Sequence, residues 1–275
     1  MIEMPADHPF TDARRGERLH KVLAEAGVAS RRACEQLITS GAVAVNATPI
    51  TSLPAWVDPA RDRITVNGKR IKTSPRHLYI ILFKPKGVIC TNADSQGRPR
   101  AIDLVNHPSG ARLFAVGRLD VDSSGLLLLT NDGDLANRIT HPRYHMPKVY
   151  EVTVKGSLDA ESVKKLEKGL FLLDPKERRG SRTARSRLKL IKRDRDRTRL
   201  LMELREGRNR QVRRMMVRAG HPVKKLRRIQ LGPLRLKGLR VGEWRQLTAR
   251  ELAVLKRAAY GKVSAAGARS RAASG

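Results

Sequence analysis

The stretch GRLDVDSSGLLLLTNDGDL occupies residues 117–135 and is the most informative segment of the chain. It places two acids and two serines between flanking glycines, directly before the apolar run LLLL at residues 126–129. A short apolar run bounded by turn residues is typical of a buried strand. The segment therefore predicts a carboxylate-bearing loop that leads into a strand over residues 125–130.

The opening of this segment also imitates an EF-hand calcium loop. Asp120, Asp122 and Ser124 would take ligand positions 1, 3 and 5, and Gly125 would take the sixth position, which is glycine in such loops. The twelfth position is Asn131 instead of the glutamate that chelates calcium, and the apolar run is a poor exit helix. The calcium interpretation therefore fails.

The remaining pattern, G-R-L-D-x-x-S-x-G-L-L-L-L-T-N-D-G, closely resembles the catalytic loop of ribosomal RNA pseudouridine synthases, in the branch that holds type A enzymes for small-subunit RNA and type B enzymes for large-subunit RNA. KVYEVTV (148–154) and EGRNRQVRRMMVRAGHPVKKLRRIQLGPL (206–234) resemble two further motifs of that family, in the family's order. With KPKG at 84–87, the resemblance runs from about residue 17 to residue 247. It implies an enzyme that isomerises a uridine of ribosomal RNA to pseudouridine.

The resemblance also implies which residues carry the reaction. It makes Asp120 the catalytic aspartate, Tyr150 the aromatic platform that stacks on the target base, and Arg213 the arginine partner of the aspartate. Asp122 is expected to order the loop as a hydrogen-bond acceptor. Two further acids, Asp132 and Asp134, are expected to serve a turn and the N-cap of the following helix.

The chemistry of the reaction explains these residue types. Breaking the N1–C1′ bond, turning the base and joining C5 to C1′ needs a carboxylate near C1′, and Asp120 could act there as nucleophile or as base. The detached uracil needs a stacking surface, and a fixed cation is needed to keep a carboxylate ionised where water is excluded. No atom is gained and no redox change occurs, so neither a cofactor nor a metal is expected.

A helix expected over residues 209–219 gives Arg213 an independent argument. At 100° per residue its apolar side chains fill one arc, and Arg213 lies about 60° beyond the edge of that arc, where it can point into a pocket. Arg210 and Arg214 project from the opposite face, which suits contacts with phosphates. Because the target nucleotide must leave its stack, the substrate is expected to be a structured or single-stranded RNA element.

The stretch ERLHKVLAEAGVASRRACEQLITSGAVAVN (residues 17–46) has its own pattern. Apolar residues at helical spacing end at Gly27, and Ser30 is placed to cap a second helix over residues 31–39. The whole stretch resembles the S4 RNA-binding domain, although the family's Asn-Gly turn is Asn-Ala here. Four basic residues lie off its apolar stripe and are expected to contact RNA phosphates: Arg18, Lys21, Arg31 and Arg32.

The order of the remaining elements predicts the fold class. Short strands mix with helices without a regular βαβ period, which favours an α+β fold with a mostly antiparallel mixed sheet. We expect a disordered lead at 1–16, an S4 domain at 17–76, a catalytic domain at 78–258 and a disordered basic tail at 259–275. Strands are expected at 78–83, 88–91, 112–118, 125–130, 148–154, 182–191 and 198–204, and helices at 134–140, 159–168, 209–219 and 249–258.

Charge and composition set the partner class. The 275 residues contain 57 Lys and Arg against 26 Asp and Glu, a net charge of +31, which favours a polyanionic partner. Residues 176–240 alone hold 25 basic and 5 acidic side chains. Beyond the S4 stretch, the residues expected to contact RNA are Arg118, Arg210, Arg214, Lys224, Lys225 and Arg227.

Other features exclude several classes. No apolar stretch approaches the roughly 18 residues of a spanning helix, the N-terminus does not read as a targeting signal, and two lone cysteines give neither a disulfide framework nor a zinc site. We therefore expect a cytoplasmic protein, a monomer, that acts on ribosomal RNA or a ribosomal assembly intermediate. A large-subunit substrate is favoured over a small-subunit one. A non-catalytic RNA-binding or assembly factor and a DNA-binding protein are the alternatives.

Overall fold

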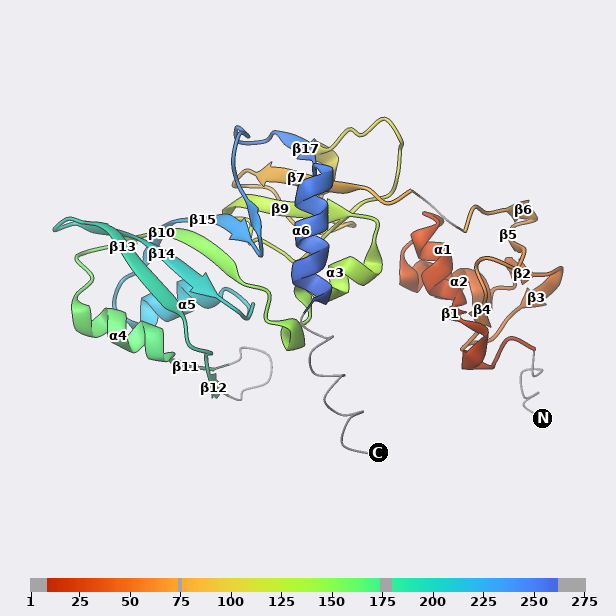
Figure 1. Ribbon diagram of the computed structural model, residues 1–275, viewed down its shortest axis with the longest axis horizontal. Coiled ribbons are helices and arrows are strands. Elements are labelled where there is room, and N and C mark those ends of the chain that lie inside the picture. Colours follow the sequence, from red (N-terminus) through yellow and green to blue (C-terminus); the bar gives the residue numbers. More distant parts are fainter. Residues whose placement is uncertain (1–8, 74–75, 174–179, 262–275) are drawn as a thin grey trace. The chain divides into compact units, whose positions relative to one another are not determined.

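The computed structural model describes residues 9–73, 76–173 and 180–261 and divides the chain into two compact units, Met1–His77 and Leu78–Gly275. Each unit mixes helices with a mostly antiparallel sheet, as Figure 1 shows. The α+β class predicted from the order of elements is confirmed.

The first unit packs two helices on short strands. Ser30 caps the helix α2 (Arg31–Thr39) by accepting a hydrogen bond from the Ala33 amide at 3.2 Å, as its position before the apolar periodicity predicted. The strands form a four-stranded sheet in the order β3-β2-β5-β6 and a separate β1-β4 pair. The helices and strands are η1 Ala13–Arg15, β1 Glu17–Arg18, α1 Leu19–Glu25, α2 Arg31–Thr39, β2 Val43–Val45, β3 Thr48–Ile50, β4 Trp56–Val57, β5 Ile64–Val66 and β6 Lys69–Arg70.

Order in this unit begins before residue 17, which corrects part of the disordered lead expected at 1–16. Phe10 is buried in the core, and its carbonyl accepts a hydrogen bond from the Trp56 amide at 2.7 Å. Asp12 accepts from the Arg14 amide at 2.9 Å and so begins η1. A single aromatic residue has no periodicity, so the sequence pattern gave no sign of this contact. Residues 1–8 lie outside the described residues.

The β2–β3 turn carries unusual strain. Asn46 and Ala47 both have positive φ, 51° and 68°. This geometry matches the two-residue hairpin turn in which glycine is favoured at the second position. Asn46 holds the turn by accepting from the Arg63 amide and donating to Asp62, each at 2.8 Å, so the hairpin forms although Ala47 replaces the family's glycine.

The second unit is built on a nine-stranded sheet with the path β13-β14-β10-β15-β9-β7-β17. β9 and β15 run parallel, and the other neighbours on this path run antiparallel. The strands are β7 Tyr79–Lys84, β8 Phe114–Ala115, β9 Ser124–Thr130, β10 Lys148–Lys155, β11 Phe171–Leu173, β12 Gly180–Arg182, β13 Arg187–Arg193, β14 Arg197–Leu204, β15 Val223–Leu231, β16 Leu234–Arg235 and β17 Trp244–Gln246. The helices are η2 Ala101–Leu104, α3 Gly133–Thr140, η3 Pro142–Tyr144, α4 Ala160–Lys168, α5 Gln211–Arg218 and α6 Ala249–Tyr260.

Helices cover different parts of this sheet (Figure 1). α4 and α5 pack with β10, β14 and β15, whereas α3 and α6 pack with β7 and β9. Leu126 and Leu128 face α3 and α6, and Leu127 and Leu129 face a second core on the opposite side. β9 is therefore buried on both faces, which explains why its apolar residues run without alternation.

Several strand predictions need correction. The strand expected at 88–91 is reduced to one isolated bridge between Ile89 and Arg100, and the one expected at 112–118 is reduced to β8. The strand expected at 182–191 is split between β12 and β13. The helix α6 runs on to Tyr260, two residues past the expected end, so the tail expected from residue 259 begins within a helix, and residues 262–275 lie outside the described residues.

Candidate active site

A tight loop between β8 and β9 carries Asp120 and Asp122. The Ser123 amide donates to the Asp120 carbonyl at 3.0 Å and turns the chain back toward the sheet. Gly125 follows at φ 116°, and a Cβ at this position would stand 2.2 Å from the Arg228 carbonyl oxygen. Only glycine lets the start of β9 approach β15 this closely, so the position of the loop depends on Gly125.

Lys84, the last residue of β7, donates hydrogen bonds to the backbone of this loop. Its fully buried ammonium donates to the carbonyls of Pro85 at 2.8 Å, Ser123 at 2.9 Å and Asp120 at 3.3 Å. Burial lowers the pKa of Lys84, although the nearby Cys90, Asp120 and Asp122 oppose that shift. Sequence reasoning treated KPKG only as a turn and missed this contact.

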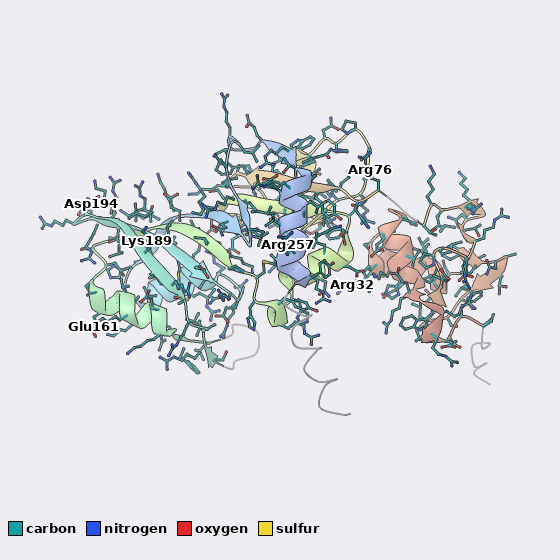
Figure 2. All side chains as sticks on the ribbon, viewed as in Figure 1. Arg32, Arg76, Glu161, Lys189, Asp194 and Arg257 are labelled. Atoms are coloured by element: carbon teal, nitrogen blue, oxygen red, sulfur yellow. The ribbon has the colours of Figure 1, made fainter. Side chains whose placement is uncertain are left out.

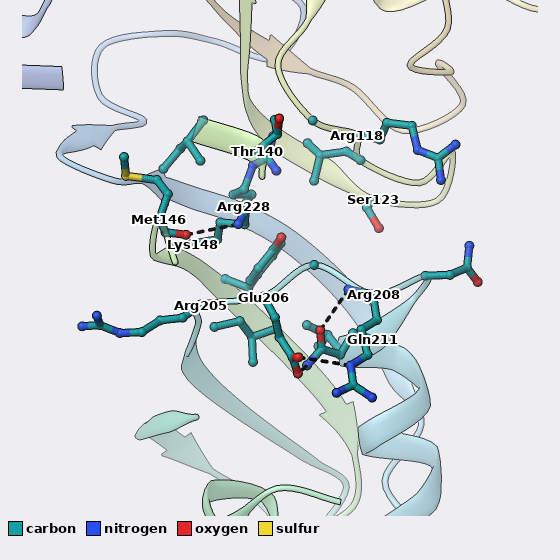
Figure 3. A pocket seen from close by; sticks show the side chains of 18 of the residues that line it. Arg118, Ser123, Thr140, Met146, Lys148, Arg205, Glu206, Arg208, Gln211 and Arg228 are labelled. Carbon is teal, nitrogen blue, oxygen red and sulfur yellow. Dashed lines mark hydrogen bonds and ion pairs between the residues drawn. The ribbon is translucent and has the colours of Figure 1, made fainter. Parts of the chain in front are cut away.

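A pocket of about 290 Å³ opens beside the loop (Figure 3). Asp120, from the loop between β8 and β9, and Tyr150, from β10, both line it. Asp120 is part-exposed, with 32% of its side chain accessible. Arg118 and Arg210, expected only to contact RNA, line the same pocket.

The arginine contacts differ from the expected pairing. Arg213 does not pair with Asp120 as expected: its Nε lies 3.1 Å from Oδ2 of Asp122, and its Nη2 donates to the Asp122 carbonyl at 2.9 Å. Arg210 is the arginine that approaches Asp120, at 3.7 Å between Nη1 and Oδ2. Its Nη2 also donates to Asp122 at 2.9 Å.

The backbone conformation of Arg210 explains why its side chain does not project from the helix in the expected direction. This residue precedes α5 in the left-handed region, with φ 46° and ψ 34°. An angle calculated for a helical residue therefore does not apply to it. Its side chain turns to the loop instead of projecting with Arg214, which is part-exposed.

The two guanidinium groups set the charge state of Asp122. Burial opposes its ionisation, but the Arg210 hydrogen bond and the Arg213 and Arg210 charges outweigh burial and hold the pKa of Asp122 below its usual value. The hydrogen bond to Asp122 raises the pKa of Arg210. Burial alone would lower that pKa, but the hydrogen bond outweighs it. Asp122 thus accepts hydrogen bonds that order the loop, as its position suggested.

The other two acids of the segment, Asp132 and Asp134, lie at the start of α3, where a turn and an N-cap were expected. Asp132 caps α3 by accepting from the Leu135 amide at 2.9 Å, and it also accepts from the Tyr79 hydroxyl at 2.7 Å. Asp134 lies in the first turn of α3. Burial and the bond to Asp132 raise the pKa of Tyr79, so this tyrosine stays protonated.

The residues expected to contact RNA differ in their exposure and in their ion pairs. Arg31 and Arg32 are exposed in the first turn of α2, where Figure 2 labels Arg32, and Arg18 is exposed beside the Trp56 ring. Lys21 lies 2.8 Å from Glu17 and 3.8 Å from Glu25, so its charge is largely neutralised. In the second unit the exposed candidates are Arg118, Lys224, Lys225 and Arg227.

The basic run at residues 224–230 proves to be part of a central strand. Along β15 exposed and buried side chains alternate, so Lys225 and Arg227 face outward whereas Arg228 faces inward and lines the pocket. Lys148, two residues before Tyr150 on β10, lines it as well. Sequence reasoning missed both residues, although a period of two in KKLRRIQ could have separated Arg228 from its neighbours.

Metal clusters and membrane-spanning helices are both missing from the described part of the chain. Within residues 9–73, 76–173 and 180–261, no group of three His, Cys, Asp or Glu side chains is placed to hold a metal ion. In the same ranges every helix is too short or too polar to cross a bilayer.

Comparison with known proteins follows the same division of the chain. The model of the RNA pseudouridylate synthase family matches residues 78–217, and that of the S4 domain matches residues 17–53. The chain is 44% identical over 243 residues to the ribosomal large subunit pseudouridine synthase B of Bacillus subtilis, covering 87% of this chain and 96% of that protein. It is 41% identical to an uncharacterized RNA pseudouridine synthase of Aquifex aeolicus, covering 88% and 94%. A crystal structure of a pseudouridylate synthase superposes with a TM-score of 0.62 at 30% identity, covering 87% of this chain and all of the other.

Proposed function

The chain belongs to the RNA pseudouridylate synthase family and carries an N-terminal S4 domain, and from this premise we propose that it converts a uridine of large-subunit ribosomal RNA to pseudouridine. The observation that carries the proposal is the meeting of Asp120 and Tyr150 in one pocket of about 290 Å³. A pocket of this size can take a flipped pyrimidine base with part of its ribose.

Asp120 supplies the reacting carboxylate. Its side chain reaches the pocket from a loop held by Lys84 and by the turn to Ser123, so its position is fixed before substrate binds. It acts at C1′ either as nucleophile or through proton abstraction. The aromatic ring of Tyr150 supports the uracil while it turns.

The arginines have separate tasks in this proposal. Arg210 lies 3.7 Å from the Asp120 carboxylate and also donates to Asp122, so it links the two acids of the loop. Arg213 acts through the loop, because it contacts Asp122 and Ser123 there and also donates to the Val223 carbonyl of β15 at 3.5 Å. Because the substrate and product are isomers, the reaction balances without a cofactor or a metal.

The rest of the chain serves RNA recognition. We assign residues 17–76 to RNA binding and residues 78–258 to catalysis, with the protein acting as a monomer in the cytoplasm. The exposed basic residues of both parts, among them Arg31, Arg32, Lys224, Lys225 and Arg227, contact phosphates of the RNA or of a ribosomal assembly particle.

The choice of large-subunit RNA rests on the Bacillus subtilis relative, whose name states that substrate. The direct test is to map pseudouridines in 23S and 16S ribosomal RNA from a strain that lacks the gene, and then to restore the missing one with purified protein. Loss of one site in 23S RNA is expected. Loss in 16S RNA instead would make small-subunit RNA the substrate, and no loss in either would favour a non-catalytic RNA-binding role.

A further inference from the structure

Two cations lie beside Tyr150 in the pocket and have no task in the mechanism above. Arg228 pairs directly with Tyr150 across β10 and β15, and Lys148 precedes Tyr150 by two residues on the same strand. Residues two apart on a strand share a face, so all three side chains line the pocket. Figure 3 shows Lys148 and Arg228 close together, with Arg228 reaching in from the neighbouring strand.

Arg228 is held in place but is not satisfied. It is only 2% exposed, and its Nε donates to the Leu126 carbonyl at 2.8 Å. Its buried Nη2 has no hydrogen-bond partner among the described residues. A buried guanidinium nitrogen without a partner is costly, which points to an acceptor that arrives with the substrate.

Lys148 also lacks a carboxylate partner within the described ranges. Its Nζ donates to the Met146 carbonyl at 3.1 Å, and no carboxylate within the described ranges forms an ion pair with it. Burial, and then the Arg228 charge, lower the pKa of Lys148. The two carboxylates of the pocket are engaged elsewhere, Asp120 near Arg210 and Glu206 with Arg208 at 3.1 Å.

The proposed reaction creates an anion beside these two cations. When the C1′–N1 bond breaks, its electron pair remains on N1 of the uracil and spreads to O2 and O4. This holds whether Asp120 bonds to C1′ or removes a proton from the ribose. After the base turns, the C5 electrons form the bond to C1′, and this step releases the Asp120 carboxylate from C1′ or, on the proton-abstraction route, returns the proton to the ribose. The C5 proton is then lost and N1 gains a proton, which restores a neutral product.

We propose that Lys148 and Arg228 stabilise the departing uracil anion, and thereby lower the barrier to glycosidic bond cleavage. Bound uridine is neutral and the detached base is charged, so both cations interact more strongly with the transition state than with the ground state. The inference rests on the proposed function, since it concerns the same pocket and the same substrate.

The test compares Lys148→Gln with wild type in single-turnover reactions, on a ribosomal RNA fragment that carries uridine or 5-fluorouridine at the target position. Fluorine withdraws electrons and makes the base a better leaving group, so it reduces the need for the cation. With uridine the variant should cleave the N-glycosidic bond about 100-fold more slowly, the typical cost of removing one such donor. With 5-fluorouridine the loss should be several-fold smaller, and RNA affinity should change little.

Controls separate this inference from its alternatives. Lys155→Gln changes an exposed lysine on the same strand outside the pocket and should keep the wild-type rate. Arg228→Gln should repeat the Lys148 pattern, and Lys148, which is only partly buried, carries the test alone if Arg228→Gln does not fold. Equal losses on both substrates, or a loss of affinity with an unchanged cleavage rate, would assign the cations to a phosphate and overturn the inference. Failure of wild type to modify either RNA would instead overturn the proposed function.

Discussion

Replacing Lys84 by methionine tests how the catalytic loop is held. The substitution keeps most of the side-chain volume but removes the ammonium that donates to the carbonyls of Pro85, Asp120 and Ser123. The Asp120 carbonyl keeps the Ser123 amide as a donor, so the part-buried Pro85 carbonyl and the buried Ser123 carbonyl are the two that lose their donor. At about 1.5 kcal/mol for each, the free energy of unfolding should fall by about 3 kcal/mol.

The same change should slow catalysis more than it weakens RNA binding. Without Lys84 the loop can shift by a fraction of an ångström or more, and a displacement of about 1 Å in a reacting group can cost about 100-fold in rate. Urea unfolding measures the first effect, and single-turnover pseudouridine formation at saturating RNA measures the second. The dissociation constant for RNA should stay close to that of wild type.

Lys86→Met is the matched control, because Lys86 lies in the same turn but is exposed. It should leave both stability and turnover rate unchanged. A Lys84→Met variant that unfolds at the wild-type urea concentration and turns over at the wild-type rate would refute the assignment of Lys84 as the positioning residue of the loop.

Three further changes test other parts of the molecule. Ala47→Gly relieves a positive φ of 68° and should raise the free energy of unfolding by about 0.5–1 kcal/mol, as measured by urea titration; a loss of stability would contradict the strain. The Arg245 hydrogen bond outweighs burial and lowers the pKa of Glu251 from 4.5 to about 2. The ionised Glu251 therefore makes its full contribution to the free energy of unfolding above pH 4.5, and this contribution is lost as the pH falls toward 2. Because solvent screens this part-exposed pair, Glu251→Gln should lower the free energy of unfolding by about 1 kcal/mol at pH 7. It should also flatten the plot of that free energy against pH in the acid range. An unchanged plot would exclude the pair as the cause of the pH dependence. Deleting residues 1–76 should flatten the plot of log K against log salt by about 0.7–0.9 for each phosphate that the S4 domain contacts, and an unchanged slope would remove the RNA-binding role of this domain.

Local signals made parts of this structure predictable from sequence. The bounds of α2 follow from the Ser30 cap and the apolar spacing, and β9 follows from an uninterrupted apolar run. The loop that carries Asp120 and Asp122 could be predicted because its glycines, acids and serines form a long family pattern. In each case the determining residues lie within a few positions of one another.

The misses share a different cause, which is contact between distant residues. Arg210 approaches Asp120 because a left-handed backbone precedes α5, and no spacing rule within the helix reports that conformation. Arg228 reaches the pocket because β15 lies between β9 and β10, beside Tyr150; the period of two could have indicated its face but not these neighbours. Lys84 finds its carbonyl partners 36 and 39 residues further along the chain.

The most direct test of the central claim is pseudouridine formation by Asp120→Asn. This change keeps the size of the side chain but removes the charge and the nucleophile, so turnover on ribosomal RNA should fall below detection while RNA affinity changes little. Asp122→Asn should keep measurable turnover, because its side-chain oxygen and carbonyl can still accept from Arg210 and Arg213. Turnover by Asp120→Asn near the wild-type rate would contradict the account, and loss confined to Asp122→Asn would make Asp122 the reacting carboxylate.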